Sequence, residues 1–267
     1  MICFPNAKIN LGLYVTGKRE DGFHNIESVF YPVPFCDVLE IIESDQFSFR
    51  AEGIQVTDNP SDNLCVKAYQ LLKDKFDLPP VSMFLLKNIP AGAGLGGGSS
   101  DAAFTLKLLN DIFNLNITVG QLTDYAAKLG SDCPFFVPNY PAYVFGRGEL
   151  MEAVDLNLKG CYIVIVCPGI HISTVEAYRN IQSFSTLNIP MPYQVKRDRP
   201  YWKETLHNDF ENYAFAQYPV LNEIKEKMYE SGAFFASMSG SGSSIYGLFE
   251  SKPDVDFGFK TWQGELG

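Results

Sequence analysis

The most informative segment of the chain reads Pro90-Ala91-Gly92-Ala93-Gly94-Leu95-Gly96-Gly97-Gly98-Ser99-Ser100-Asp101. Between Gly92 and Gly98 it holds five of the chain's 22 glycines. The alternating run 81–87 before it predicts a strand, and the apolar run 102–109 after it predicts a helix. Glycines let backbone N–H groups converge on a ligand, and a helix N-terminus adds free donors and partial positive charge. The segment therefore predicts a phosphate-binding loop.

Two familiar phosphate loops fit this segment poorly. Gly92-x-Gly94-x-x-Gly97 matches the dinucleotide fingerprint, but that motif also needs an acid about 20 residues on, where 110–116 reads as a helix end and a loop. A Walker loop has lysine after its last glycine, where this chain has Ser99. The positive charge must therefore come from the helix end, a metal ion or a lysine elsewhere. A flexible linker is the remaining alternative, although linkers seldom join a strand and a helix patterned this well.

Composition limits the classes of protein and partner. A chain of 267 residues is near the size at which one core gives way to two. With 46% hydrophobic and 19% charged residues, it is typical of a soluble globular protein. No apolar run approaches the roughly 20 residues that span a bilayer, and residues 1–8 lack the features of a signal peptide. The net charge of −10 argues against nucleic acid and anionic membranes as partners.

Cysteine and histidine are used sparingly. The six cysteines form no C-x-x-C pair and lie in a long, evenly apolar chain, which predicts free thiols in a reducing cytoplasm. The three histidines are far apart, which argues against a zinc site, and no residue is assigned as a metal ligand. The oligomeric state stays open between monomer and homodimer.

Residues 6–15 read as an N-terminal strand. Alternation puts Ala7, Ile9, Leu11 and Leu13 on one face, and Lys8, Asn10 and Gly12 on the other. Two polar residues side by side on a face relieved by glycine suit contact with a ligand. An ordinary solvent-exposed face is the alternative, and these residues alone favour it.

The rest of the first half alternates strands and helices. Asp132 stands in a turn just before an apolar run that reads as a strand, and by itself it suits a turn or cap better than a catalyst. The other expected elements are a turn-rich loop at 16–22, extended segments at 23–31, 37–43 and 47–50, a helix capped by Ser61 or Asp62 and ending near Phe76, and a helix from Thr118 to Leu129.

The second half begins after a boundary expected within 146–160. The continuously apolar run 161–167 predicts a strand buried on both faces. A second small-residue loop, Ser239–Ser244, precedes a strand at 245–249, so each half contributes one glycine-serine loop to a ligand expected between the halves. The other elements are a helix capped by Ser173 or Thr174, mostly loop at 184–205, and helices at 206–216 and 219–231.

Three separated motifs now occur together: the loop 90–100, the strand with Lys8 and Asn10, and Ser239–Ser244. The combination resembles the GHMP kinase superfamily, which includes galactokinase, homoserine kinase and mevalonate kinase, over essentially the whole chain. The resemblance implies an α+β, two-domain fold. Its active site would lie in the cleft between an N-terminal ATP-binding domain, 1–155, and a smaller C-terminal α/β-sandwich domain, 156–267.

Four segments narrow the resemblance to one branch of the superfamily. They are Asn6-Ala7-Lys8-Ile9-Asn10, Asp21-Gly22-Phe23-His24, the loop 94–100, and Gly130-Ser131-Asp132-Cys133-Pro134. They are similar to the members that phosphorylate the 2-hydroxyl of 4-diphosphocytidyl-2-C-methyl-D-erythritol with ATP, in the non-mevalonate route to isoprenoids. The implied partner is a small substrate with a cytidine diphosphate group.

The resemblance also implies a role for each residue. The ATP phosphates would lie in the loop 90–100, over a helix beginning near Asp101, with Mg²⁺ as a second cofactor and Ser100 as its candidate ligand. Asp132 would be the base for the substrate hydroxyl, and Lys8 would keep it ionised. The substrate residues would be Asn10 beside the alcohol, His24 on the cytosine edge between Phe23 and Tyr178, and Phe30 and Thr174 in the same pocket.

Departures and alternatives remain. Phe23 stands where relatives often have tyrosine, and Tyr178 where they often have phenylalanine. The alternatives are another small-alcohol kinase of the homoserine or mevalonate type, a dehydrogenase, or a non-enzymatic nucleotide sensor. The segment with His24 disfavours the first, the missing acid disfavours the second, and retention of Lys8 with Asp132 disfavours the third.

Overall fold

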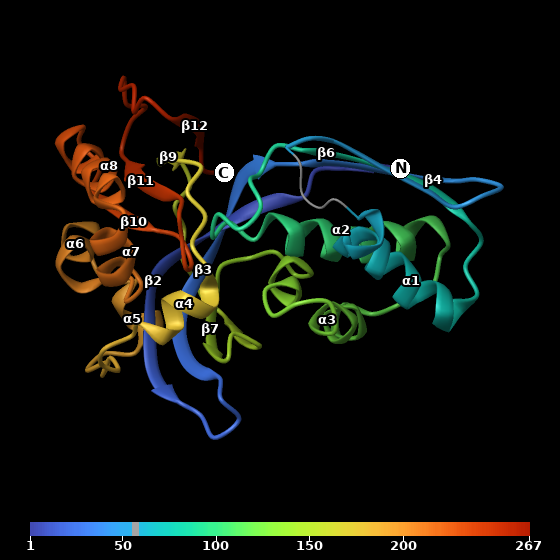
Figure 1. Cartoon of the computed structure of the whole chain (residues 1–267), viewed down its shortest axis with the longest axis horizontal. Coiled ribbons are helices and arrows are strands. Elements are labelled where there is room, and N and C mark those ends of the chain that lie inside the picture. Colours follow the sequence, from blue (N-terminus) through green and yellow to red (C-terminus); the bar gives the residue numbers. More distant parts are fainter. Residues whose placement is uncertain (55–58) are drawn as a thin grey trace. The chain divides into compact units, whose positions relative to one another are not determined.

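A computed structural model describes residues 1–54 and 59–267 (Figure 1). The chain forms two compact units, and neither is continuous in sequence. Unit 1 comprises Met1–Ala7, Phe35–Ala91 and Gly96–Tyr140, and unit 2 comprises Lys8–Pro34, Gly92–Leu95 and Pro141–Gly267. Because compact units describe packing and not ancestry, the division into domains 1–155 and 156–267 stays a prediction.

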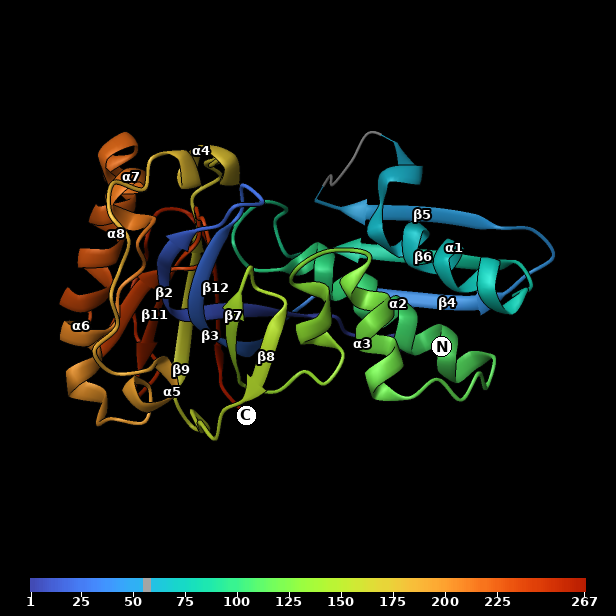
Figure 2. The ribbon, with the colours of Figure 1, turned by 90° about the horizontal axis from the view of Figure 1, so that it is seen from below.

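Unit 1 is a mixed sheet covered by helices. Its strands lie in the order β1-β4-β6-β5, with β5 parallel to β6 and the other pairs antiparallel. Figure 2 shows α1 and α2 lying along this sheet. The elements are β1 (Ile2–Cys3), β4 (Val38–Glu43), β5 (Ser48–Gly53), β6 (Val81–Lys87), η1 (Pro60–Asp62), α1 (Leu64–Phe76), α2 (Gly97–Ile112), α3 (Val119–Ala127) and η2 (Cys133–Phe136).

The helix boundaries of unit 1 correct three expectations. The N-cap of α1 is Asn63, whose side chain accepts from the Cys65 N–H, and not Ser61 or Asp62. Thr118 caps α3 as expected, but the helix ends at Ala127 instead of Leu129. The apolar run after Asp132 forms the 3₁₀ helix η2 and not a strand, since Pro134 removes a backbone donor.

Unit 2 contains two four-stranded sheets, in the orders β2-β3-β7-β8 and β10-β11-β9-β12. Every strand pair with a defined register in these sheets is antiparallel. The strands are β2 (Asn6–Lys18), β3 (His24–Cys36), β7 (Ala142–Gly146), β8 (Leu150–Ala153), β9 (Tyr162–Cys167), β10 (Phe235–Met238), β11 (Ile245–Phe249) and β12 (Lys260–Glu265).

The helices of unit 2 are short except for one. They are α4 (Thr174–Arg179), α5 (Met191–Gln194), η3 (Arg199–Tyr201), α6 (Trp202–Thr205), α7 (Glu211–Gln217) and α8 (Pro219–Glu230). The segment 184–205 was expected to be mostly loop, and it holds three of these short helices. The helix expected from Leu206 begins only at Glu211. The loop expected from Thr16 begins later, because β2 continues to Lys18.

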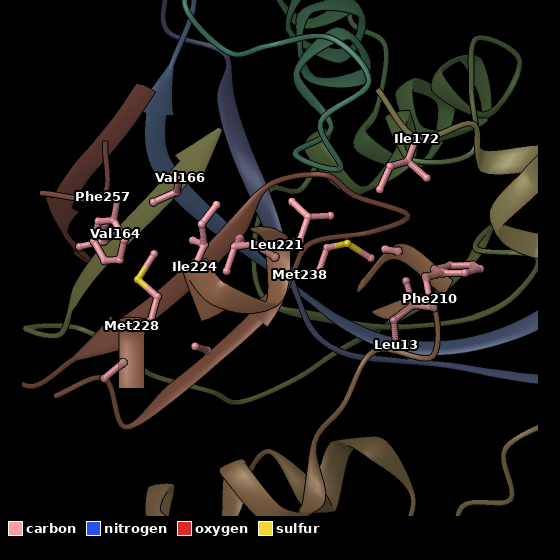
Figure 3. Packing of buried hydrophobic residues seen from close by; sticks show 14 of the residues in the cluster. Leu13, Val164, Val166, Ile172, Phe210, Leu221, Ile224, Met228, Met238 and Phe257 are labelled. Carbon is pink, nitrogen blue, oxygen red and sulfur yellow. The ribbon is translucent and has the colours of Figure 1, made fainter. Parts of the chain in front are cut away.

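The core of unit 2 lies between α8 and the sheet β10-β11-β9-β12. The apolar stripe predicted on α8, Leu221, Ile224 and Met228, is buried against this sheet, as Figure 3 shows. Val164 and Val166 of β9 belong to the same cluster, as does Leu13 of β2. The cluster thus links the N-terminal strand β2 to the C-terminal half of the chain.

Shortening the first side chain of this stripe tests the core. Leu221 is 0% exposed, so Leu221→Ala leaves a cavity and should lower the free energy of unfolding by about 2–5 kcal/mol. Urea unfolding at constant pH measures the loss. Asn222→Ala, at the next and exposed position of α8, is the control and should change it by less than about 0.5 kcal/mol. Equal losses in the two variants would contradict this account.

Candidate active site

The polar face of β2 is buried. Lys8 is 3% exposed and Asn10 is 1% exposed, so the alternative of a solvent-exposed face is wrong. Lys8 Nζ donates to Asn10 Oδ1 at 2.6 Å and lies 4.3 Å from the centre of the Phe30 ring. Asn10 Nδ2 donates to Ser28 Oγ at 2.9 Å, which fixes the amide orientation. Because a buried ammonium is costly without such partners, this face is built to hold Lys8 in place.

The two glycine-serine loops meet in unit 2. Ser239 Oγ donates to Gly94 O at 2.8 Å, and Ser244 N–H donates to Ala93 O at 3.2 Å. A Cβ added to Gly94 would lie 1.8 Å from Ser239 O, so only glycine permits this approach. Leu95 O also accepts from the Lys8 N–H at 2.9 Å. The middle of the first loop is therefore held between β2 and the second loop.

Asn208 and Glu211, which the sequence did not single out, hold the second loop. Asn208 Nδ2 donates to Met238 O and to Gly240 O, each at 2.8 Å. Glu211 Oε1 accepts from the Met238 N–H at 2.8 Å. Both side chains are buried, with Asn208 2% and Glu211 7% exposed. The polar residues His207, Asn208 and Asp209, in a segment predicted to be a plain helix, were the available signal.

The phosphate loop leads into a helix in unit 1, as the sequence predicted. Helix α2 has Gly96 as N-cap, in a left-handed conformation with φ 71°. It begins at Gly97, earlier than the start expected near Asp101, so 97–100 form its first turn. Free N–H groups at this end favour an anion. The Ser100 hydroxyl oxygen is buried there without a hydrogen-bond partner among the described residues.

The turn with Asp132 lies against this first turn of α2. Asp132 is the N-cap residue of η2, is half-buried, and makes no capping hydrogen bond with its side chain. The side chains of the next residue, Cys133, and of Ser99 both lie beside Gly130, where a Cβ would be 3.2 Å from Cys133 Sγ and 3.9 Å from Ser99 Oγ. Unit 1 therefore places the predicted base close in the fold to the end of the phosphate loop. Lys8 belongs to unit 2, and its pairing with Asp132 stays a prediction.

Two of the residues expected around the substrate's cytosine, His24 and Tyr178, pack together in unit 2. The rings of His24 and Tyr178 stack, with centres 4.9 Å apart and planes 15° from parallel. Phe184 lies 6.2 Å from His24, an aromatic that the sequence did not assign. Phe23 is 56% exposed and lies 5.1 Å under the Arg147 guanidinium. Phe23 and Tyr178, which were expected to flank the same base, therefore have different neighbours: Tyr178 stacks on His24, and Phe23 lies beside Arg147.

Electrostatics keeps His24 neutral. Partial burial, reinforced by the Lys18 charge, lowers the pKa of His24 below its ordinary value of 6.5. A neutral imidazole has one donor and one acceptor nitrogen, and can bond a partner that also offers one of each. Thr174 begins α4, and its hydroxyl lies 2.9 Å from Ser241 Oγ, which joins α4 to the second glycine loop.

Comparisons with known proteins cover the whole chain. Residues 63–139 match the GHMP kinases N terminal domain and residues 193–265 the GHMP kinases C terminal family. A 4-diphosphocytidyl-2-C-methyl-D-erythritol kinase of Bacteroides thetaiotaomicron is 52% identical over 97% of this chain and 96% of its own. One from Cytophaga hutchinsonii is 47% identical over 96% of this chain and 94% of its own.

The chain belongs to the 4-diphosphocytidyl-2-C-methyl-D-erythritol kinase family of GHMP kinases. A crystal structure of a 4-(cytidine 5'-diphospho)-2C-methyl-D-erythritol kinase has a TM-score of 0.84 and 30% identity, covering 100% of this chain and 99% of that one. The predicted α+β GHMP kinase fold is thereby confirmed. As a GHMP kinase, the protein is an enzyme that phosphorylates an alcohol with ATP.

Other sequence expectations have mixed outcomes. All six cysteines are free, as predicted. In the part of the chain that the structure describes, no helix is long and apolar enough to cross a bilayer. Among the same residues, no group of three or more His, Cys, Asp or Glu could hold a metal ion. The cytoplasmic location and the choice between monomer and homodimer stay predictions.

A methyl group at Gly94 should separate the two glycine loops. Gly94→Ala places Cβ against Ser239 O in a backbone with φ 78°, so we expect the KM for ATP to rise by about tenfold or more. Steady-state kinetics at saturating acceptor measures it. Gly160→Ala is the matched control, because φ is 82° and its Cβ would meet nothing within 4 Å. A KM for ATP unchanged in Gly94→Ala would contradict the close approach.

Proposed function

We propose that the protein transfers the γ-phosphoryl group of ATP to the 2-hydroxyl of 4-diphosphocytidyl-2-C-methyl-D-erythritol, in the non-mevalonate route to isoprenoid precursors. The observation that carries the choice of substrate is the stack of His24 on Tyr178. A substrate alcohol that carries no nucleobase needs neither His24 nor Tyr178 for its binding. The full-length similarity to relatives with this named activity supports the same substrate.

The ATP side of the proposed site is the loop 90–100. Its first-turn N–H groups and the positive end of α2 would bind phosphate oxygens, which compensates for the absence of a Walker lysine. Ser239–Ser244 would border the same phosphates, since Ser239 contacts Gly94. Phosphoryl transfer depends mainly on positioning and on neutralising charge, and fixed backbone donors supply both.

Mg²⁺ is the second proposed cofactor, and the donor set fits it modestly. The buried Ser100 hydroxyl, without a partner among the described residues, is an oxygen ligand of the kind that Mg²⁺ takes. No acidic cluster adds to it in the described part of the chain. ATP and water would therefore hold most of the ion, whose chemistry would be to neutralise charge on the phosphates.

The proposed base is Asp132. Its carboxylate can accept the proton of the attacking hydroxyl. Lys8 would keep that carboxylate ionised and stabilise the transferring group, while Asn10, bonded to Lys8 at 2.6 Å, would orient the ammonium and the substrate alcohol. A lysine on a buried strand is held more firmly than one on a loop, which suits this role.

The cytosine ring is proposed to lie beside the stacked rings of His24 and Tyr178 in unit 2. Neutral His24 would bond the edge of the base, with Tyr178, Phe23, Phe30 and Thr174 around it. Phe30 is 3% exposed and contacts Lys8, so it would join the base-binding residues to the catalytic strand. Stacking of a nucleobase on aromatic rings is worth about 1–3 kcal/mol per base.

A phosphorylation assay of the purified protein with ATP and Mg²⁺ tests the proposal. The cytidine-linked alcohol should be phosphorylated with a kcat/KM at least about 10³-fold above that for homoserine or mevalonate, because those alcohols leave the base-binding groups unpaired. Preference for either small alcohol would favour the other kinase type. ATP binding without turnover of any acceptor would favour a nucleotide sensor.

Replacing the proposed base should remove turnover and spare binding. Asp132→Asn keeps the size of the side chain but cannot accept the proton, so kcat should fall by about 10²–10⁴-fold. The dissociation constants for ATP and for the cytidine substrate, measured by calorimetry, should change little. Ser131→Ala, at the exposed neighbouring position, is the control. Near-normal kcat in Asp132→Asn would exclude Asp132 as the base.

His24→Ala should raise the KM for the cytidine substrate by about tenfold or more and the KM for ATP by less than about twofold. The pKa of His24 is lowered, so the neutral form persists to more acid pH than usual. In the native enzyme the substrate KM should therefore stay flat from neutral pH to below the ordinary imidazole pKa of 6.5, and rise only at more acid pH. Parallel changes in both KM values would refute the cytosine role.

A further inference from the structure

Unit 1 contains a buried cluster of three charged side chains that the proposed chemistry does not use. Lys87 Nζ donates to Asp101 Oδ2 at 2.7 Å and also to Asp37 Oδ2. The side chains are 1% exposed at Lys87, 0% at Asp37 and 3% at Asp101. The cluster lies among residues of one compact unit, at the two ends of the phosphate loop.

Lys87 joins the element before the loop to the element after it. It is the last residue of β6, and Asp101 lies on α2, just beyond that helix's first turn. The chain between them contains the whole loop 90–100. The ion pair therefore fixes the end of the strand relative to the beginning of the helix, whose N–H groups are proposed to bind phosphate.

Asp37 fixes the entry into the loop. Its Oδ1 accepts from the N–H groups of Asn88 and Ile89, at 2.6 and 2.9 Å. These two residues follow β6 directly. Asp37 itself stands just before β4, the strand paired with β6. One carboxylate thus closes the end of the sheet, bonds the backbone leading into the loop, and holds the ammonium of Lys87.

The start of α2 packs directly on this cluster. A Cβ added to Gly97 would lie 2.8 Å from Ile89 Cγ2 and 3.2 Å from Lys87 Nζ. The first residue of the helix therefore has no room for a side chain. Because protein interiors are close-packed, a shift of Lys87 or Ile89 would also shift the N-terminus of α2.

The charges of the cluster favour a positioning role over a stabilising one. Burial raises the pKa of the Asp101 carboxyl; Lys87 opposes the rise and Asp37 adds to it. Burial would lower the pKa of Lys87, but the two carboxylates outweigh it and raise that pKa. Apolar side chains of similar volume often replace buried ion clusters with equal or better stability. An apolar side chain in place of Asp37 could not accept hydrogen bonds from the N–H groups of Asn88 and Ile89.

We propose that Asp37, Lys87 and Asp101 are positioning residues for ATP, which set the conformation of the phosphate loop from its two ends. The inference rests on the proposed function only in taking the loop 90–100 as the phosphate site. None of the three touches the reacting atoms in this scheme. Their effect reaches ATP through the backbone of the loop and the first turn of α2.

The test combines nucleotide affinity with hydrogen exchange. Asp37→Ala removes the acceptor of two N–H groups, and should raise the dissociation constant for MgATP, measured by calorimetry, by about tenfold or more. Amides of 88–100 should exchange faster by mass spectrometry, while those of α3 do not. Asp37→Asn keeps an acceptor oxygen and should restore most of the affinity. Affinity in Asp37→Ala within about twofold of the native value would overturn the proposal.

Two further variants separate positioning from general destabilisation. Val81→Ala truncates a fully buried residue at the opposite end of β6. An equal loss of MgATP affinity in Val81→Ala, at an equal loss of urea midpoint, would also overturn the proposal. If Asp37→Ala does not fold, Asp101→Asn keeps the pair of Lys87 and Asp37. It should weaken MgATP binding about threefold and speed exchange at 97–100 only, and no change in either would refute the role of Asp101.

Calorimetry needs no acceptor alcohol, so the two proposals fail in different ways. If the native protein binds MgATP but does not phosphorylate the cytidine substrate, the proposed substrate is wrong and the positioning role is still measured. If the native protein phosphorylates the substrate and the Asp37 and Asp101 variants bind MgATP as it does, the positioning role is wrong and the proposed function stands.

Discussion

A contact between two backbones, at Gly94 and Ser239, governs the arrangement of the functional groups in unit 2. No side chain fits at position 94, because its Cβ would overlap the carbonyl oxygen of Ser239. The two loops can therefore approach until Ser239 Oγ bonds both Gly94 O at 2.8 Å and Asn10 Oδ1 at 3.4 Å. The position of Asn10, and through it of Lys8, follows from this approach.

Close partners also explain how the polar residues of β2 can lie inside the protein. A buried ammonium loses much hydration free energy, which only close partners recover. Lys8 has Asn10 as acceptor and the face of Phe30 beside it. Asn10 is in turn held by Ser28 and by Tyr246, whose hydroxyl donates to Asn10 O at 2.6 Å. Each partner fixes the next, so Lys8 and Asn10 are held in a buried and rigid strand.

Local patterns were sufficient to predict most elements and the phosphate loop. The alternation in β6 and the stripe on α8 each reflect one buried face, which is a property of neighbouring residues. The burial of Lys8 could not be predicted this way, because its partners Phe30 and Leu95 are remote in sequence. Family resemblance, rather than periodicity, singled out Lys8, His24 and Asp132.

The misses have two physical origins, a choice between equivalent neighbours and contacts between remote residues. The N-cap of α1 is Asn63 and not Ser61 or Asp62. All three side chains cap helices well, so propensity could not decide between them. Asn208 and Glu211 act on backbone groups about 30 residues away, which no local pattern reveals. The cluster around Lys87 likewise joins residues about 50 and 14 positions away. Sequence patterns predicted the glycine loop and the helix after it, but not the side chains that shape the loop.

The discontinuity of unit 2 has a consequence for synthesis. Strands β2 and β3 leave the ribosome first, yet β3 pairs with β7 in the register Ile26 to Gly146, and Leu13 of β2 bridges to Asn208. The hairpin must therefore wait for most of the chain before its second edge is covered. Contacts of such long sequence separation slow folding. The strand that carries Lys8 therefore gains its last backbone contacts late in synthesis, after Asn208 has emerged.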